Sequence, residues 1–86
     1  MHTVDLREQA LDLAQRLGYR IREEWLGGSG GGQCDFAGQR WIFVDLALNA
    51  AEQLEQVAAA LRSDPAINEF PQPPVLRRLL AARKPA

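Results

Sequence analysis

The chain has 86 residues, of which 47% are hydrophobic, and its formal net charge is −1 at pH 7. This length excludes a multidomain enzyme, because chains divide into domains only well beyond it. The composition excludes a disordered or fibrous protein. The nearly balanced charge provides no general attraction to nucleic acid or to an anionic membrane. Since a core this small gives modest stability, the length also favours self-association.

Residues 5–17 carry hydrophobic side chains at helical spacing. The stripe consists of Leu6, Ala10, Leu13, Ala14 and Leu17. Asp5 and Glu8 have the spacing of a capping box, and Gly18 can adopt the left-handed conformation that ends a helix. The pattern therefore predicts an amphipathic helix over this segment.

The hydrophobic period then changes from that of a helix to that of a strand. Residues 19–25 largely alternate between apolar and charged side chains, which predicts a strand with one solvated face. Residues 34–37 and 39–46 predict two more strands, with a tight turn at Gly38. Because residues 41–44 are all apolar, we expect their strand to be central and covered on both faces. The simplest arrangement is a three-stranded antiparallel meander.

A second helix and a proline-rich C-terminal segment follow the predicted sheet. Asn49 and Glu52 form a capping box before an inward stripe that consists of Leu54, Val57, Ala58 and Leu61. Asp64 and Pro65 predict a short helical turn. We therefore expect an α+β domain over 1–70, followed over 71–86 by a proline-rich connector and a short, basic, amphipathic C-terminal helix.

The sequence contains few residues that could form a metal site or activate a nucleophilic cysteine. Cys34 is the single cysteine and His2 the single histidine, so a zinc site with three or four ligands and an internal disulfide are both disfavoured. A reactive Cys34 would need a base such as His2, and a half-buried structural thiol is the preferred interpretation. We expect no cofactor and no metal. With no signal peptide or membrane-spanning stretch, a cytoplasmic protein is expected.

A glycine-rich segment over 27–33 is the most conspicuous motif. It contains Gly27, Gly28, Ser29, Gly30, Gly31 and Gly32. It matches neither the phosphate-binding loop of nucleotide hydrolases nor the dinucleotide fingerprint, and it joins two predicted strands, so we interpret it as a flexible hairpin loop. The alternative is a small-molecule or anion site, with an enzymatic role left open, that uses the segment's N–H groups with Cys34, Asp35 and Arg40 nearby. Asp35 and Asp45 lie on neighbouring predicted strands, where solvated carboxylates are the default interpretation.

Charge is distributed unevenly along the chain. Residues 71–86 contain four basic residues and no acidic residue, whereas the preceding residues contain six basic and eleven acidic ones. We expect the basic helix to dock on the acidic body of its own chain or of a neighbouring subunit. Binding of nucleic acid or of a membrane surface is the rival interpretation, and we disfavour both.

Three segments of the chain resemble the N-terminal half of small zinc metallopeptidases of the ImmA/IrrE type, some of which cleave phage-type repressors. The similar segments are Leu17-Gly18-Tyr19-Arg20-Ile21-Arg22, Arg40-Trp41-Ile42-Phe43-Val44-Asp45 and Ala51-Glu52-Gln53-Leu54. In that family the following helix carries two zinc-binding histidines and a glutamate general base. Here Ala59 and Ser63 stand at the histidine positions and Ala60 at the glutamate position. The resemblance therefore implies the fold without its catalytic residues, and no peptidase residue is carried over.

The function that these features favour is a non-enzymatic interaction or regulatory module, which self-associates or docks on a partner protein. Its supports are a small core, a sheet with an open edge, and small residues that let another helix approach. The candidate interaction residues are Ala58, Ala59, Leu76, Leu79, Leu80, Arg77 and Arg78.

Overall fold

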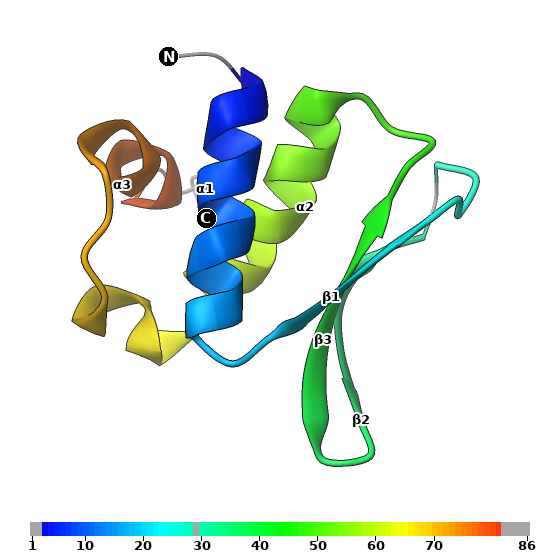
Figure 1. The fold of residues 1–86 in the computed structure, drawn as a ribbon, viewed down its shortest axis with the longest axis horizontal. Coiled ribbons are helices and arrows are strands. Elements are labelled where there is room, and N and C mark those ends of the chain that lie inside the picture. Colours follow the sequence, from blue (N-terminus) through cyan, green and yellow to red (C-terminus); the bar gives the residue numbers. More distant parts are fainter. Residues whose placement is uncertain (1–2, 29, 82–86) are drawn as a thin grey trace, which may run out of the picture.

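The structure of the protein, a computed structural model, describes residues 3–28 and 30–81. Its elements in chain order are the helix α1 (Thr3–Arg16), the strands β1 (Arg20–Glu24), β2 (Gly32–Phe36) and β3 (Gln39–Asp45), the helix α2 (Ala50–Arg62), the 3-10 helix η1 (Pro65–Glu69) and the helix α3 (Pro74–Ala81). The predicted α+β class is confirmed (Figure 1).

Both ends of α1 follow from local backbone chemistry. Gly18 ends the helix with a φ of +98°, a conformation that residues with a Cβ rarely adopt. The helix begins at Thr3, so Asp5 lies within its first turn, where its charge complements the helix dipole. The expected capping box of Asp5 and Glu8 is therefore wrong.

The order of the strands in the sheet is β1-β3-β2, which differs from the predicted meander. β1 pairs with β3 in parallel, and β2 pairs with β3 antiparallel, so the sheet is mixed. A meander would place β2 in the centre, but its sequence Gly-Gln-Cys-Asp-Phe is largely polar, whereas the apolar β3 gains two neighbours in the observed order. The glycine-rich segment consequently joins the two edge strands and crosses the end of β3, so the expectation of a hairpin loop there is wrong.

The predicted turn at Gly38 is confirmed as the connection of the β2–β3 hairpin. Ala37 and Gly38 have φ values of +54° and +75°. Positive φ at both central residues is the signature of the two-residue turn whose twist matches that of the flanking strands. Pairing of Phe36 with Gln39 closes the hairpin directly at this turn.

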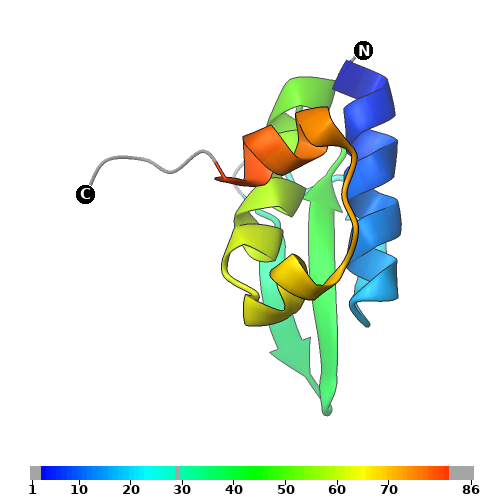
Figure 2. The ribbon, with the colours of Figure 1, turned by 90° about the vertical axis from the view of Figure 1, so that its left-hand side faces the viewer.

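The helices cover only one face of the sheet. Ile42 and Val44 of β3 are fully buried against the helical layer, whereas the alternate residues Trp41 and Phe43 are only half-buried. Figure 2 shows the helices in front of the sheet, and in Figure 1 no described helix lies on the other side of it. The expectation that β3 is covered on both faces is wrong, because the small chain places α1 and α2 on the same side.

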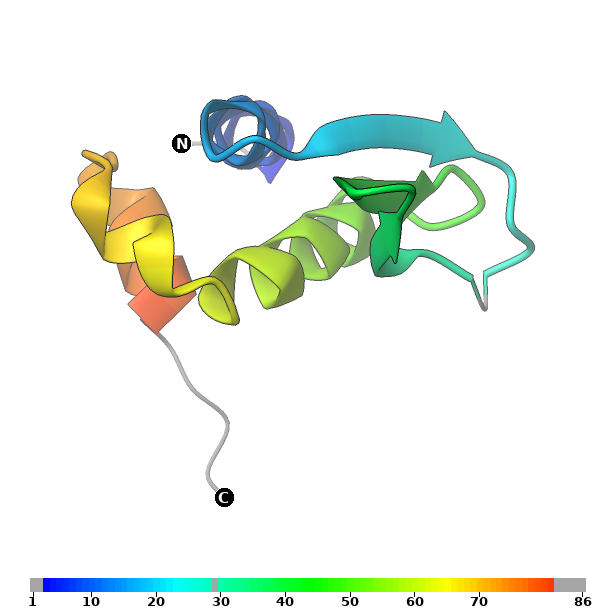
Figure 3. The ribbon, with the colours of Figure 1, turned by 90° about the horizontal axis from the view of Figure 1, so that it is seen from below.

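The second helix and the C-terminal segment complete the core. The capping box of Asn49 and Glu52 is confirmed at the start of α2, and Asp64 caps η1 through the N–H of Ala66. Seen from below (Figure 3), α3 lies on the side of the helix pair that is remote from the sheet. It packs against both α1 and α2. The segment from Pro74 to Ala81 therefore belongs to the same core as the rest of the chain.

Candidate functional site

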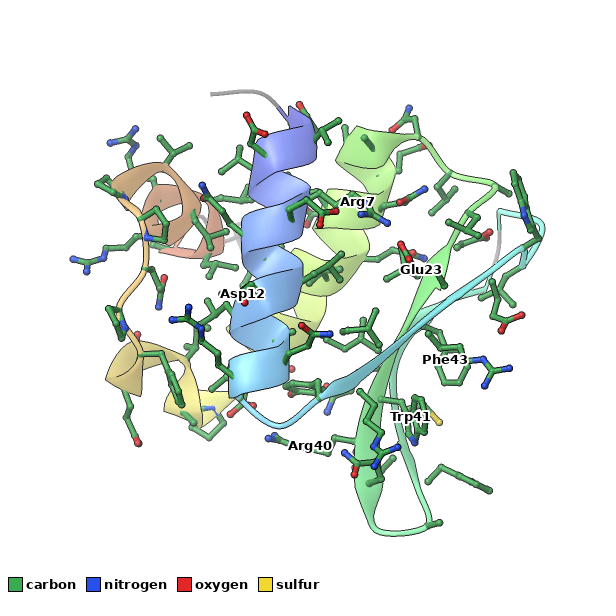
Figure 4. All side chains as sticks on the ribbon, in the orientation of Figure 1. Arg7, Asp12, Glu23, Arg40, Trp41 and Phe43 are labelled. Carbon is green, nitrogen blue, oxygen red and sulfur yellow. The ribbon has the colours of Figure 1, made fainter. Side chains whose placement is uncertain are left out.

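The uncovered face of the sheet carries aromatic, basic and thiol side chains. The strand registers place Arg20 and Cys34 on either side of Trp41, and Arg22 beside Phe43. Figure 4 shows that Trp41 and Phe43 project away from the helices. We define the open face as Arg20, Arg22, Glu24, Cys34, Phe36, Trp41 and Phe43.

Two aromatic side chains at or beside the open face are strongly exposed to solvent. Phe36 is 70% exposed near the end of β2, and Trp25 is 75% exposed directly after β1. Single exposed apolar residues are common on protein surfaces. Here, however, the strand register puts Phe36 on the same face as Trp41 and Phe43, so three aromatic side chains lie on one surface of the sheet.

The central aromatic side chains are held in place by their neighbours. The guanidinium of Arg20 lies 5.8 Å from the centroid of the Trp41 ring, within the range of a cation–π contact. The rings of Trp41 and Phe43 are 6.1 Å apart and tilted by 35°. Arg22 and Glu24 form an ion pair of 2.6 Å along β1. The face thus presents ordered aromatic surface with its charges confined to β1.

Cys34 lies in the middle of β2 with its side chain exposed. Its thiol makes a long contact of 3.8 Å with the carbonyl oxygen of Asp35. The histidine that was considered as its base, His2, is outside the described residues. The interpretation of Cys34 as a half-buried structural thiol is wrong, because β2 is an edge strand and leaves the side chain exposed.

The carboxylate of Asp45 binds the glycine-rich connector internally. It is fully buried and accepts hydrogen bonds from the N–H groups of Leu26 at 2.9 Å, Gly28 at 2.6 Å and Ala47 at 2.9 Å. Gln56 of α2 adds a donor to the carbonyl oxygen of Gly30 at 2.8 Å. The chain's own carboxylate thus occupies two of the N–H groups that a bound anion would require.

Protonation of Asp45 is opposed by this arrangement. Burial alone would raise the pKa of the Asp45 carboxyl, yet hydrogen bonds from backbone N–H groups, first of all those of Leu26, Ala47 and Gly28, hold that pKa below its usual 3.8. A lowered pKa in the folded state stabilises the fold at neutral pH, and this contribution is lost as pH falls through the folded-state pKa. The connector is therefore anchored by an ionised carboxylate.

Replacing Asp45 by Asn is expected to loosen the connector. The amide nitrogen must replace one of the two acceptor oxygens, which leaves at least one connector N–H without its partner. Amide hydrogen exchange should become faster at Leu26 and Gly28. The matched change Asp35→Asn, at an exposed position, should leave both rates unchanged, and equal rates in the two variants would contradict this role of Asp45.

The remaining candidate polar residues fall into a separate cluster. The buried carboxylate of Asp64 accepts hydrogen bonds from Tyr19 at 3.0 Å and from Arg40 at 2.7 Å. Arg40 also lies over the Tyr19 ring, 4.3 Å from its centroid. Asp35 pairs with Arg40 in the sheet, five residues from Asp45 along β3. About 3.3 Å per residue separates the two carboxylates by more than a hydrogen bond can span, so they form no catalytic pair.

The predicted interaction residues divide between core and surface. Ala58 and Leu76 are fully buried, and Leu80 is nearly so. Ala58 thus belongs to the common core, and the two leucines dock α3 on its own chain. The other four predicted residues are accessible from the surface. They are the exposed Ala59, Arg77 and Arg78 and the partly buried Leu79. Among the described residues, Arg77 and Arg78 form no ion pair, so α3 is held by apolar packing and by a hydrogen bond of 3.1 Å from the Arg62 guanidinium to the carbonyl oxygen of Leu79.

The three positions that the resemblance aligns with metallopeptidase residues lie on two sides of α2. Ala59 and Ser63 line a shallow groove between α2, η1 and α3, whereas Ala60 is buried. Within residues 3–28 and 30–81, no three side chains of His, Cys, Asp or Glu gather where they could hold a metal ion.

The open face is the site that sequence reasoning missed. The sequence contains one indication of this face: Arg20 and Arg22 alternate with Ile21, which indicates that one face of the sheet is solvated. The apolar run through Trp41 and Phe43 concealed that these two side chains share this solvated face.

Comparisons with family models, with curated proteins and with solved structures found no match. Among the described helices, none combines the length and the apolar character needed to cross a bilayer.

Proposed function

We propose that the protein is a non-enzymatic interaction module that binds protein through the open face. The observation that carries this proposal is the aromatic surface of the exposed Phe36 and the half-buried Trp41 and Phe43, on a sheet face that no helix or strand of the described residues covers. Covering this face would bury aromatic area at roughly 25 cal/mol per Å². Its aromatic side chains and arginines are also the residue types enriched in protein interfaces.

Two features of the sheet support protein binding over the alternative of a ligand site at the connector. The connector N–H groups of Leu26 and Gly28 already bind Asp45, so an anion would have to displace a buried carboxylate. Arg22 and Glu24 form an ion pair, which leaves Arg20 as the one open-face cation without an ion pair among the described residues, and a single cation gives little attraction to phosphates. As part of the same proposal, the exposed free thiol of Cys34 favours a reducing compartment such as the cytoplasm.

The resemblance to ImmA/IrrE-type metallopeptidases adds a proposal about origin. The chain would be a scaffold of that kind in which Ala59, Ala60 and Ser63 replace the catalytic residues. A scaffold without its chemistry is consistent with a binding role.

Tryptophan fluorescence provides a direct test, because the chain contains only two tryptophans. One, Trp41, lies on the open face, and the other, Trp25, directly follows β1. We expect the emission to shift to the blue and iodide quenching to fall when the face is covered, either as protein concentration rises from about 1 μM to about 1 mM or when a partner binds. The Phe36→Ser variant should weaken both effects.

The control is Val4→Ser, which removes an exposed apolar side chain from α1 and leaves the sheet unchanged. The proposal fails if the protein is monomeric at every concentration and if, in addition, the unchanged protein and Phe36→Ser capture the same proteins equally well. Capture counts as support only where Phe36→Ser abolishes it and Val4→Ser does not.

A further inference from the structure

The two edges of the sheet differ in how well they are protected against pairing with another strand. Four of the five β1 residues are charged, and Glu23 of β1 is bound by Arg7 of α1. β2 has one charged residue, Asp35, and its residues are mostly exposed. Charged side chains are the usual protection of an edge strand. β2 is therefore the edge at which another strand can pair.

We infer that β2 pairs antiparallel with β2 of a second copy of this chain, about a two-fold axis at Cys34, to form a continuous six-stranded sheet. This inference rests on the proposed function and names the partner. In this dimer, the open face of one copy continues directly into the open face of the other. A two-fold axis is the symmetry of most homodimers, and it requires the strand to be complementary to itself.

The sequence of β2 is complementary to itself in this register. An axis at Cys34 places Phe36 opposite Gly32 of the second copy, and it places Gln33 opposite Asp35. The amide of Gln33 can donate a hydrogen bond to the opposing carboxylate. An axis at Asp35 would instead oppose two carboxylates, which is destabilising. An axis at Gln33 would place Phe36 opposite Gly30, which lies outside β2.

Gly32 provides space for the incoming aromatic ring. Nothing lies within 4 Å of the position that a Cβ on Gly32 would occupy. In the paired sheet, Phe36 of one copy lies over this gap, with Phe43 on the far side of the glycine. An aromatic ring placed across a strand glycine compensates for the missing side chain. The exposed Phe36 and the bare Gly32 thus serve the same contact, once in each half of the dimer.

Charge substitutions at Gln33 test both the pairing and its register. Gln33 is exposed, and the one hydrogen bond of its side chain among the described residues is a long one, 3.4 Å, from the Ser63 hydroxyl to its amide oxygen, so the fold tolerates either sign of charge. By symmetry, Gln33→Lys creates two ion pairs with Asp35, and Gln33→Asp creates two like-charge pairs. Sedimentation equilibrium under reducing conditions measures the dissociation constant of the dimer. This constant should be about tenfold lower for Gln33→Lys, and about tenfold higher for Gln33→Asp, than for the unchanged protein.

The controls are Gln15→Lys and Gln15→Asp, which make the same charge changes at an exposed position of α1. Neither should alter the dimer constant by more than about twofold. A second measurement uses oxidised glutathione. Two Cys34 thiols at the axis should reduce it to two molecules of glutathione and become one intermolecular disulfide, and Phe36→Ser should lower the yield.

Three outcomes would overturn the inference. The first is a monomer at every concentration, in which case the capture experiment with Phe36→Ser decides the proposed function by itself. The second is a dimer that Phe36→Ser dissociates but that both Gln33 variants leave unchanged, which keeps the open face as the interface and removes edge pairing. The third is a blue shift of the tryptophan emission when a single-stranded oligonucleotide is added and the protein stays monomeric. That result would mean that the open face binds nucleic acid.

Discussion

Unfolding of the Asp64→Ala variant is expected to require about 3 kcal/mol less free energy than unfolding of the unchanged protein. The substitution removes the cap of η1 and leaves Tyr19 and Arg40 without their shared acceptor. A charge-assisted hydrogen bond contributes about 1.5–3 kcal/mol and a cap about 1 kcal/mol, but Arg40, at 39% exposure, regains part of its loss from water. Urea denaturation measures the difference.

The matched control for this prediction is Asp12→Ala. Asp12 forms an ion pair with Arg16 on the exposed side of α1, at 3.0 Å. Exposed pairs of this kind contribute between 0 and about 1 kcal/mol. Tyr19→Phe, which removes one donor to Asp64, should lie between the two, at about 1 kcal/mol. If Asp64→Ala and Asp12→Ala destabilise the protein equally, the buried cluster has no special role.

The same cluster sets part of the pH dependence of stability. Burial would raise the pKa of the Asp64 carboxyl, but its hydrogen bonds and the charge of Arg40 hold that pKa below its usual 3.8. The unfolded state therefore binds protons at a higher pH than the folded state does. The stabilisation by Asp64 is complete above the unfolded-state value and is lost as pH falls through the lowered folded-state pKa. Asp64→Ala should accordingly show a flatter stability profile over the acid range.

The Leu76→Ala variant is expected to lose about 3 kcal/mol of stability. The Leu76 side chain is fully buried where α3 packs on the other helices, so its truncation leaves a cavity. Arg77→Ala, at the neighbouring exposed position, should change stability by less than about 0.5 kcal/mol. Thermal unfolding of both variants provides the comparison. Equal stability of the two would mean that α3 does not belong to the core and that its basic face is available for another role.

Local rules predicted the helices and turns of this fold well. The capping box of Asn49 and Glu52, the turn at Gly38 and the helix end at Gly18 all depend on a few neighbouring residues, and the structure has each of them. The N-terminal start of α1 was misjudged, because Asp5 fits the first turn of a helix as well as its cap.

The order of the strands depends on contacts between distant residues and was therefore harder to predict. Periodicity shows that residues 39–45 form a strand, but it does not show which strands lie beside it. The open face was missed for the same reason, because periodicity does not show which face of a strand the helices cover. Trp41 and Phe43 were predicted to be covered because apolar runs usually are, whereas the positions of α1 and α2 decide which face stays open. Of the three leucines expected on the candidate surface of α3, the structure places Leu76 and Leu80 in the core and leaves Leu79 partly buried.

The crossing of the connector over the end of β3 also has a consequence for the order of folding. The β2–β3 hairpin closes over a two-residue turn, so it forms at little cost in chain entropy. Pairing of β1 with β3 must enclose the connector and the whole hairpin, which makes it the slower step. Until Asp45 has captured the connector, β3 has one unpaired edge and β2 has another. A newly made chain is then able to pair with its neighbours at either strand, and the glycines, by letting the connector close quickly, shorten that period.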